Sequence, residues 1–307
     1  MNIVEVPAQL DDATFDALVE RFDEARGARM LMDARRLRWV DPYGMLGLLV
    51  LGELAYGDGE RPRLELPESA DVLSYLTRMG FFRHAATFFE TPTRRRGGDG
   101  ASDVLLEITP VRSHTDVHRV VDRVNERALA ILTRQLNYPL REAFQFSVML
   151  SEVCQNIIDH AESGGWVATQ TYNWAKRLGR KVVQISVMDL GVGFKGSLAS
   201  EHAARYGNRW SDASALEAAF IHGLTRFHDP GRGQGLQQIR KQVGRWSGKV
   251  AIRSGTARIA DVPAWDDAQP LEEELAPLPG AQISIVLPAS QAVEGQTAEG
   301  SHAEQAR

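Results

Sequence analysis

Residues 181–193 read Lys-Val-Val-Gln-Ile-Ser-Val-Met-Asp-Leu-Gly-Val-Gly, and this stretch decides how the second half of the chain is organised. Its first eight residues are rich in β-branched and apolar side chains, which predicts a strand. Asp189 would then lie at the end of that strand. Gly191 and Gly193 follow it, where glycines relieve the steric limits on the backbone and allow close approach to a bound group. Taken alone, the same pattern is typical of an ordinary turn.

Two further motifs flank this strand in the sequence. Residues 146–160 are apolar-periodic and contain neither Pro nor Gly, which predicts a helix. Within it, Glu152 and Asn156 share one face, with β-carbons roughly 5–6 Å apart. Residues 231–235, Gly-Arg-Gly-Gln-Gly, precede a second predicted helix at 236–245. A helix N-terminus favours phosphate through its free N–H groups and its dipole.

In this order, the three motifs resemble the GHKL superfamily of ATP-binding domains, which includes histidine kinases, gyrase-type and mismatch-repair ATPases, heat-shock chaperones and the anti-sigma serine kinases. The resemblance covers roughly residues 103–288. It extends to Gly235-Leu-Gln-Gln-Ile-Arg-Lys-Gln-Val243, Ser247-Gly-Lys-Val250 and Gly280-Ala-Gln-Ile-Ser-Ile-Val-Leu-Pro288, which look like the family's closing helix, hairpin and last strand. It implies a Bergerat-type α/β sandwich, with a mixed sheet covered by helices on one face, and the cofactors ATP and Mg.

The resemblance also implies roles for individual residues. Asn156 would be the ligand to Mg, which prefers oxygen ligands and keeps several waters. Glu152 would orient or deprotonate a nucleophile aimed at the γ-phosphate. Ionised Asp189 only accepts hydrogen bonds, which suits the amino group of adenine and disfavours guanine. The other expected nucleotide contacts are Gly191 and Gly193 near the base, Gly231, Gly233 and Gly235 near the phosphates, and Arg232 either at the γ-phosphate or in solvent.

Residues 194–230 correspond to the family's ATP lid, and only 213–223 within them predict a clear helix. Long irregular loops in compact domains often act as lids. Lys195, Arg226 and His228 are candidate phosphate contacts there, against ordinary solvent exposure. His160 either approaches the phosphates or Glu152, or interacts with the dipole at the end of its helix.

Two departures bear on the assignment to a family branch. Many relatives have a threonine after the glycine of the last strand, whereas Gly280 is followed by Ala281; Ser284 or water would have to substitute. His114 and His118 open a predicted helix at 115–135 without the His-Glu or His-Asp pattern of a phosphoacceptor, so a sensor histidine kinase is not favoured.

The first 90 residues alternate predicted strands (2–6, 29–33 and 63–66) with predicted helices (11–24, 44–55 and 71–79). This order, together with Met30-Leu-Met-Asp-Ala-Arg-Arg-Leu-Arg-Trp-Val-Asp41-Pro-Tyr-Gly44, resembles the STAS domain of anti-sigma-factor antagonists. The antagonists usually carry serines after this aspartate, one of which accepts phosphate. Pro42 and Tyr43 occupy those positions, so the phosphorylation switch looks lost. We expect Asp41 to cap the helix with Pro42 in its first turn, and Tyr43 is a weaker candidate acceptor.

Composition fits a soluble cytoplasmic regulator. The chain has 307 residues, is 43% hydrophobic and 24% charged, and carries a net charge of -5, which argues against nucleic acid as a partner. Its single cysteine, Cys154, allows no intrachain disulfide and fits a reducing compartment. No segment predicts a membrane span. The expected organisation is a STAS-like regulatory domain (1–90), a linker (91–103), the GHKL ATP-binding domain (104–289) and a disordered tail (290–307).

These expectations describe a bacterial ATP- and Mg-binding signalling protein of the anti-sigma, partner-switching type. Its partner would be a separate regulatory protein of the STAS or sigma-factor type, and serine or threonine kinase activity on that protein is expected as one outcome. The alternatives are a non-catalytic ATP-dependent conformational switch and a slow GHKL ATPase clamp. The sequence does not decide between a monomer and a homodimer.

Overall fold

The computed structural model describes residues 1–59, 61–90, 105–111, 114–160, 164–176, 178–225 and 235–290. Within these ranges, the side chains of residues 105, 114–121, 124, 154 and 156–160 are not described. The predicted linker and all but the first residue of the predicted tail lie outside the described residues. No helix in the described part of the chain is long and apolar enough to cross a membrane.

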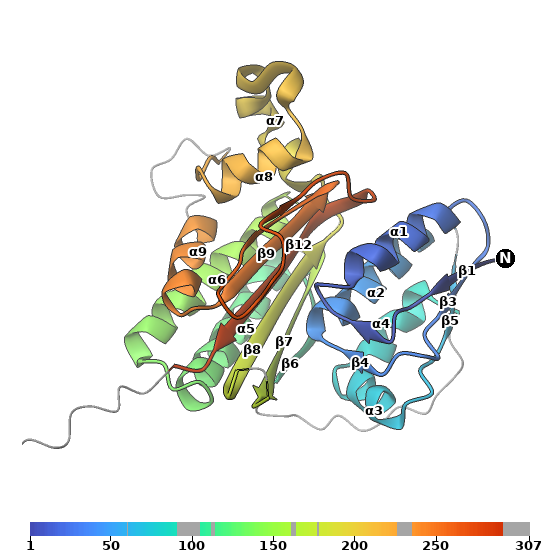
Figure 1. The fold of residues 1–307 in the computed structure, drawn as a ribbon, viewed down its shortest axis with the longest axis horizontal. Coiled ribbons are helices and arrows are strands. Elements are labelled where there is room, and N and C mark those ends of the chain that lie inside the picture. The colour runs from blue at the N-terminus through green and yellow to red at the C-terminus, as the bar shows by residue number, and fades with distance from the viewer. Residues whose placement is uncertain are drawn as a thin grey trace, which may run out of the picture.

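The protein is a mixed α/β structure built around one large sheet of seven strands (Figure 1). Its strand order is β11-β10-β9-β12-β8-β7-β6. The strands are β6 (Leu105–Val111), β7 (Gly165–Trp174), β8 (Arg180–Asp189), β9 (Lys249–Gly255), β10 (Ala257–Asp261), β11 (Leu271–Glu272) and β12 (Leu278–Pro288).

Every described pair of neighbouring strands in this sheet is antiparallel, so the expectation of a mixed sheet is wrong for the described strands. The connections explain the difference. Strand β6 is followed by two helices of equal length, α5 (His114–Arg134) and α6 (Leu140–His160). Two helices return the chain to the end of the sheet at which it left, so β7 runs against β6. Short hairpins give the same result between β7 and β8 and between β9 and β10.

Alternate residues of the central strands point to opposite faces of the sheet. On β8, Val183, Ile185 and Val187 belong to a core shared with α5, α6, α8 (Asp212–Phe220) and α9 (Gly235–Arg245). Met188, by contrast, belongs to a second core on the other face. The helix-covered face is the one on which α5, α6 and α9 lie in Figure 1.

The first 90 residues cover the second face of the large sheet. They contain a parallel sheet in the order β1-β3-β5 (Asn2–Glu5, Met30–Asp33 and Arg63–Glu65). Two-residue strands, β2 (Gln9–Leu10) and β4 (Trp39–Val40), pair beside it. The helices are α1 (Phe15–Ala25), α2 (Pro42–Gly57), α3 (Ala70–Arg78) and α4 (Phe81–Phe88).

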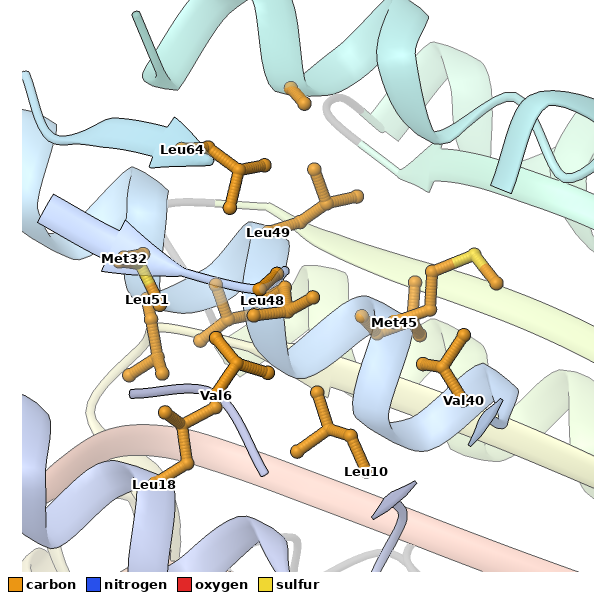
Figure 2. Packing of buried hydrophobic residues seen from close by; sticks show 14 of the residues in the cluster. Val6, Leu10, Leu18, Met32, Val40, Met45, Leu48, Leu49, Leu51 and Leu64 are labelled. Carbon is orange, nitrogen blue, oxygen red and sulfur yellow. The ribbon is translucent and has the colours of Figure 1, made fainter. Parts of the chain in front are cut away.

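Helix α2 lies between the two sheets. It packs on β7 and β8 of the large sheet, and every residue from Pro42 to Gly52 is buried. Figure 2 shows Met45, Leu48 and Leu49 of this helix among Val6, Leu10 and Leu64 of the surrounding elements. The same core includes Trp166, Met188 and Leu278 of the large sheet. The first unit and the large sheet therefore share one hydrophobic core. Helices α5, α6, α8 and α9 cover one face of the large sheet, as expected for this domain, and the first unit covers the other face.

Charged and polar contacts surround this shared core. Arg253 Nε of β9 donates to Asp16 Oδ1 of α1 at 2.6 Å, and Lys249 Nζ lies 2.9 Å from Asp12 Oδ2. Trp166 Nε1 donates to Glu53 Oε2 of α2 at 2.8 Å. These pairs join the first unit to the large sheet, and they supply the partners that buried charges need.

The periodic segments are helices and strands as expected, and two helices were missed. Helix α4 follows Gly80, which ends the preceding helix at φ +75°. Helix α7 (Gly193–Tyr206) occupies the segment expected to be an irregular lid. It buries only Leu198, so its sequence shows little apolar periodicity.

Candidate nucleotide site

Asp189 is buried, with 6% of its surface exposed. It lies at the end of β8 on the same face as Val187, which is the helix-covered face. Gly191 N donates to its Oδ1 at 2.8 Å. Burial raises the pKa of the Asp189 carboxyl to about 7, and backbone hydrogen bonds from Gly191 and Ala281 act in the opposite direction. The carboxyl is therefore a buried acceptor with little solvent around it.

Gly280 has no side chain, and Asp189 occupies the space that a side chain at this position would fill. Gly280 has φ +81°, and a Cβ at this position would lie 2.0 Å from the Asp189 carbonyl oxygen and 2.7 Å from Oδ1. Gln282 Nε2 on the same strand donates to the Asp189 carbonyl at 3.2 Å. The start of β12 therefore forms one wall of this site.

Ser254 of β9 connects the site to helix α7, and the sequence did not single it out. Its hydroxyl donates to the Gly280 carbonyl at 2.7 Å and accepts from Phe194 N at 3.1 Å. Gly193, in the first position of α7, has φ +64°, and a Cβ there would lie 2.6 Å from Ser254 Oγ. One buried hydroxyl thus holds the start of α7 against the wall of the Asp189 site. The only feature of the sequence that could have pointed to Ser254 is that it is a serine at the end of an apolar strand.

Glu152 on α6 lies against the first residue of α9. A Cβ on Gly235 would lie 2.5 Å from Glu152 Oε2 and 3.0 Å from Glu152 Cβ. The structure therefore brings together two motifs that are more than eighty residues apart in the sequence. Partial burial raises the pKa of the Glu152 carboxyl, which favours its acting as a proton acceptor nearer neutral pH.

The other predicted contacts are described in part or not at all. Asn156 lies in α6 one turn after Glu152, but its side chain and that of His160 are not described. Gly231, Arg232 and Gly233, together with Arg226 and His228, lie outside the described residues. Lys195 is exposed on α7, with no described contact to the Asp189 site.

Ser284 cannot replace the missing threonine at the site. Its neighbours Ile283 and Ile285 belong to the core under α5, α6 and α9, so alternation places Ser284 on the opposite face. It is buried there opposite Ser186 of β8. Ser284 therefore faces the first unit, while Asp189 faces the helices.

The loop of the first unit that resembles the antagonist phosphorylation site is also buried. Asp41 caps α2, as expected, by accepting from Gly44 N at 2.7 Å, and it accepts a further bond from Gln184 Nε2 of β8. Tyr43 is 3% exposed and stacks edge-on against Phe15. Burial raises the pKa of the Tyr43 hydroxyl. A kinase could not reach Tyr43 while the two units are packed together.

No model of a protein family matches this chain, and no curated protein matches it at a significant level. A buried acceptor walled by glycine-bearing backbone fits a flat, donor-bearing ring such as adenine. The N-terminus of α9 fits a phosphate through its free N–H groups, and the Glu152 carboxylate beside it could orient a nucleophile.

Proposed function

We propose that residues 104–289 bind ATP and Mg as a GHKL domain of the anti-sigma type, and that the first 90 residues are a degenerate STAS domain. The observation that carries this proposal is the contact between Glu152 and Gly235. It joins the helix predicted to bear the acidic and metal-binding side chains to the helix whose N-terminus would receive phosphate. Asp189, a buried acceptor on the same face of the sheet, supports the same assignment independently.

In this proposal each described residue of the candidate site has a physical role. Asp189 accepts a hydrogen bond from the adenine amino group, and Gly280 leaves room for the carboxyl. Glu152 orients a hydroxyl or water and takes up its proton, which its raised pKa favours. Bound ATP with Mg supplies the transferable phosphoryl group. Asn156 would hold Mg, and Gly231, Arg232 and Gly233 would surround the phosphates with Gly235.

The acceptor is proposed to be a serine or threonine on a separate protein. Two observations support an acceptor outside this chain's STAS-like loop. Pro42 has no hydroxyl, and Tyr43 of α2 is buried against Phe15 of α1. A regulatory protein of the STAS or sigma-factor type, carrying an accessible hydroxyl, would fit the family branch that the sequence resembles.

The test follows the γ-phosphate of labelled ATP with Mg, using the full chain, Glu152→Gln and Asp189→Ala, each with and without a cell lysate. We expect label on a lysate protein that is lost in Glu152→Gln while ATP binding is kept. We expect Asp189→Ala to lose ATP binding itself. Normal ATP binding by Asp189→Ala would refute the proposed adenine contact, and free phosphate instead of labelled protein would favour the ATPase clamp.

The position of Ser254 favours the non-catalytic switch as a second candidate. Because its hydroxyl joins the wall of the Asp189 site to the N-terminus of α7, a ligand at Asp189 would change how α7 is held. ATP that binds but keeps its γ-phosphate, together with altered proteolysis within α7, would support the switch over the kinase.

A further inference from the structure

Helix α6 exposes a row of large apolar side chains. Leu140, Phe144 and Val148 are 67%, 58% and 43% exposed, and their spacing of four residues places them on one face of the helix. Single exposed apolar residues are common, but a contiguous apolar row on a folded protein is typical of an interaction surface. In the described part of the chain, nothing covers this row.

Phe144 and Val148 of this row line one side of a groove whose other side is α9. Trp246 Nε1 donates to Glu142 Oε2 at 3.0 Å near the start of α6, and Gly235 touches Glu152 near its end. The two helices therefore run antiparallel along the groove, which has a volume of about 460 Å³. Its lining residues are Phe144, Gln145, Val148, Met149 and Glu152 of α6 and Gln238, Lys241, Gln242 and Arg245 of α9.

The α9 side of the groove is basic. Lys241 and Arg245 are exposed, and their spacing places them on one face of α9. Neither forms an ion pair with a described acidic residue, and Arg245 Nη1 has only a long contact of 3.4 Å to Gln242. An apolar row beside two cations calls for a partner with apolar side chains on one face and carboxylates along one edge.

We propose that the groove between α6 and α9 docks an acidic amphipathic segment of another protein. Its apolar side chains pack on Phe144 and Val148, and its carboxylates pair with Lys241 and Arg245. A second copy of this chain fits less well, because it presents the same two cations on this face. Docking as such does not depend on nucleotide chemistry.

One consequence rests on the proposed function. The groove ends at Glu152, eight residues beyond Phe144, which is roughly 12 Å at the rise of an α-helix. A docked helix covers the same distance in about eight residues. A docked segment would therefore present a hydroxyl to Glu152 from a position about eight residues away from its apolar anchor.

The test measures fluorescence anisotropy of two labelled peptides with the full chain in the absence of nucleotide. One peptide is an amphipathic helix of leucine, alanine and glutamate, and the other has lysine at each glutamate. We expect saturable binding of the acidic peptide and binding at least about tenfold weaker for its basic counterpart. Phe144→Ser, and Lys241→Glu combined with Arg245→Glu, should each weaken binding of the acidic peptide by about tenfold or more.

Two variants at equally exposed positions elsewhere serve as controls. Ile3→Ser on β1 (61% exposed) and Arg205→Glu on α7 should leave binding unchanged. Equal binding of both peptides, no saturable binding, or unchanged binding by the groove variants would overturn the proposal. A dimer in sedimentation that Phe144→Ser dissociates would also overturn it. So would binding of the acidic peptide by a chain that ends at Ser290 but not by the full chain. Loss of phosphate transfer with peptide binding intact would count against the proposed function alone.

Discussion

Arg253 of the large sheet and Asp16 of the first unit form an ion pair in which the arginine side chain is fully buried, with 2.6 Å between Arg253 Nε and Asp16 Oδ1. The same guanidinium donates to the Gly255 carbonyl at 3.1 Å and to the Ala276 carbonyl. A buried cation that keeps all of these partners is tolerated in a core, whereas one that loses its carboxylate is not. The pair therefore links the packing of the two units to the stability of the whole protein.

Asp16→Ala should lower the free energy of unfolding by about 3–5 kcal/mol, because it leaves the Arg253 charge buried without its carboxylate. Urea unfolding followed by tryptophan fluorescence measures this. Asp58→Ala is the control. It removes a pair with Arg26 in which both side chains are about a third or more exposed, so a change of about 0–1 kcal/mol is expected. Equal effects of the two substitutions would contradict a buried role for Asp16.

Removal of the first 90 residues should destabilise the remainder of the chain. It would expose Ile108, Trp166, Met188 and Leu278, which are at most 4% exposed in the full protein. Such a patch favours aggregation. Gel filtration and dye binding to exposed apolar surface would detect the change. A monomeric, cooperatively unfolding fragment that binds no such dye would show that the sheet does not need this cover.

Asp189 should make the protein less stable as the pH rises from about 4 to about 7. Its pKa is raised from 3.8 to about 7 by burial, so in this window the folded protein holds a proton that the unfolded chain releases. The stability that the Asp189 proton contributes is fully present below pH 3.8 and is lost as the pH rises through about 7. The Asp189→Asn variant keeps the shape and removes the titration. Relative to the unsubstituted protein, this variant should therefore gain stability across the same pH window in urea unfolding, and a difference that stays constant would refute the raised pKa.

Gly235→Ala should displace the Glu152 carboxyl, because the new Cβ would lie 2.5 Å from Oε2. A displacement of about 1 Å at a reacting group lowers turnover by up to roughly a hundredfold, so phosphate transfer or hydrolysis should fall while the fold is kept. Gly244→Ala lies in the same helix with open space around it. It should leave turnover unchanged and stabilise the helix by up to about 1 kcal/mol. If Gly235→Ala turned over ATP normally, Glu152 would not be positioned by this contact.

Local periodicity was enough to predict the elements that carry the candidate site. Helix α6, strand β8 and helix α9 each show a clear apolar pattern, and glycines lie close to their ends. Helix α7 lacks such a signal because it buries only Leu198. Ser254 was missed for a different reason, since its role depends on Gly280 and Phe194, which are distant in the sequence and meet only in the folded protein.

The sequence by itself determined that the strongly periodic segments, such as α6 and β8, become helices and strands, because the period of apolar residues follows from backbone geometry. It also contained one sign of the larger arrangement, since α2 is apolar all round and a helix of that kind must be covered on every side. Only the tertiary structure decided what covers it. The bond between Asp41 and Gln184, which are 143 residues apart, shows why: contacts at that separation depend on shape and charge complementarity between two folded surfaces, and no local pattern encodes them.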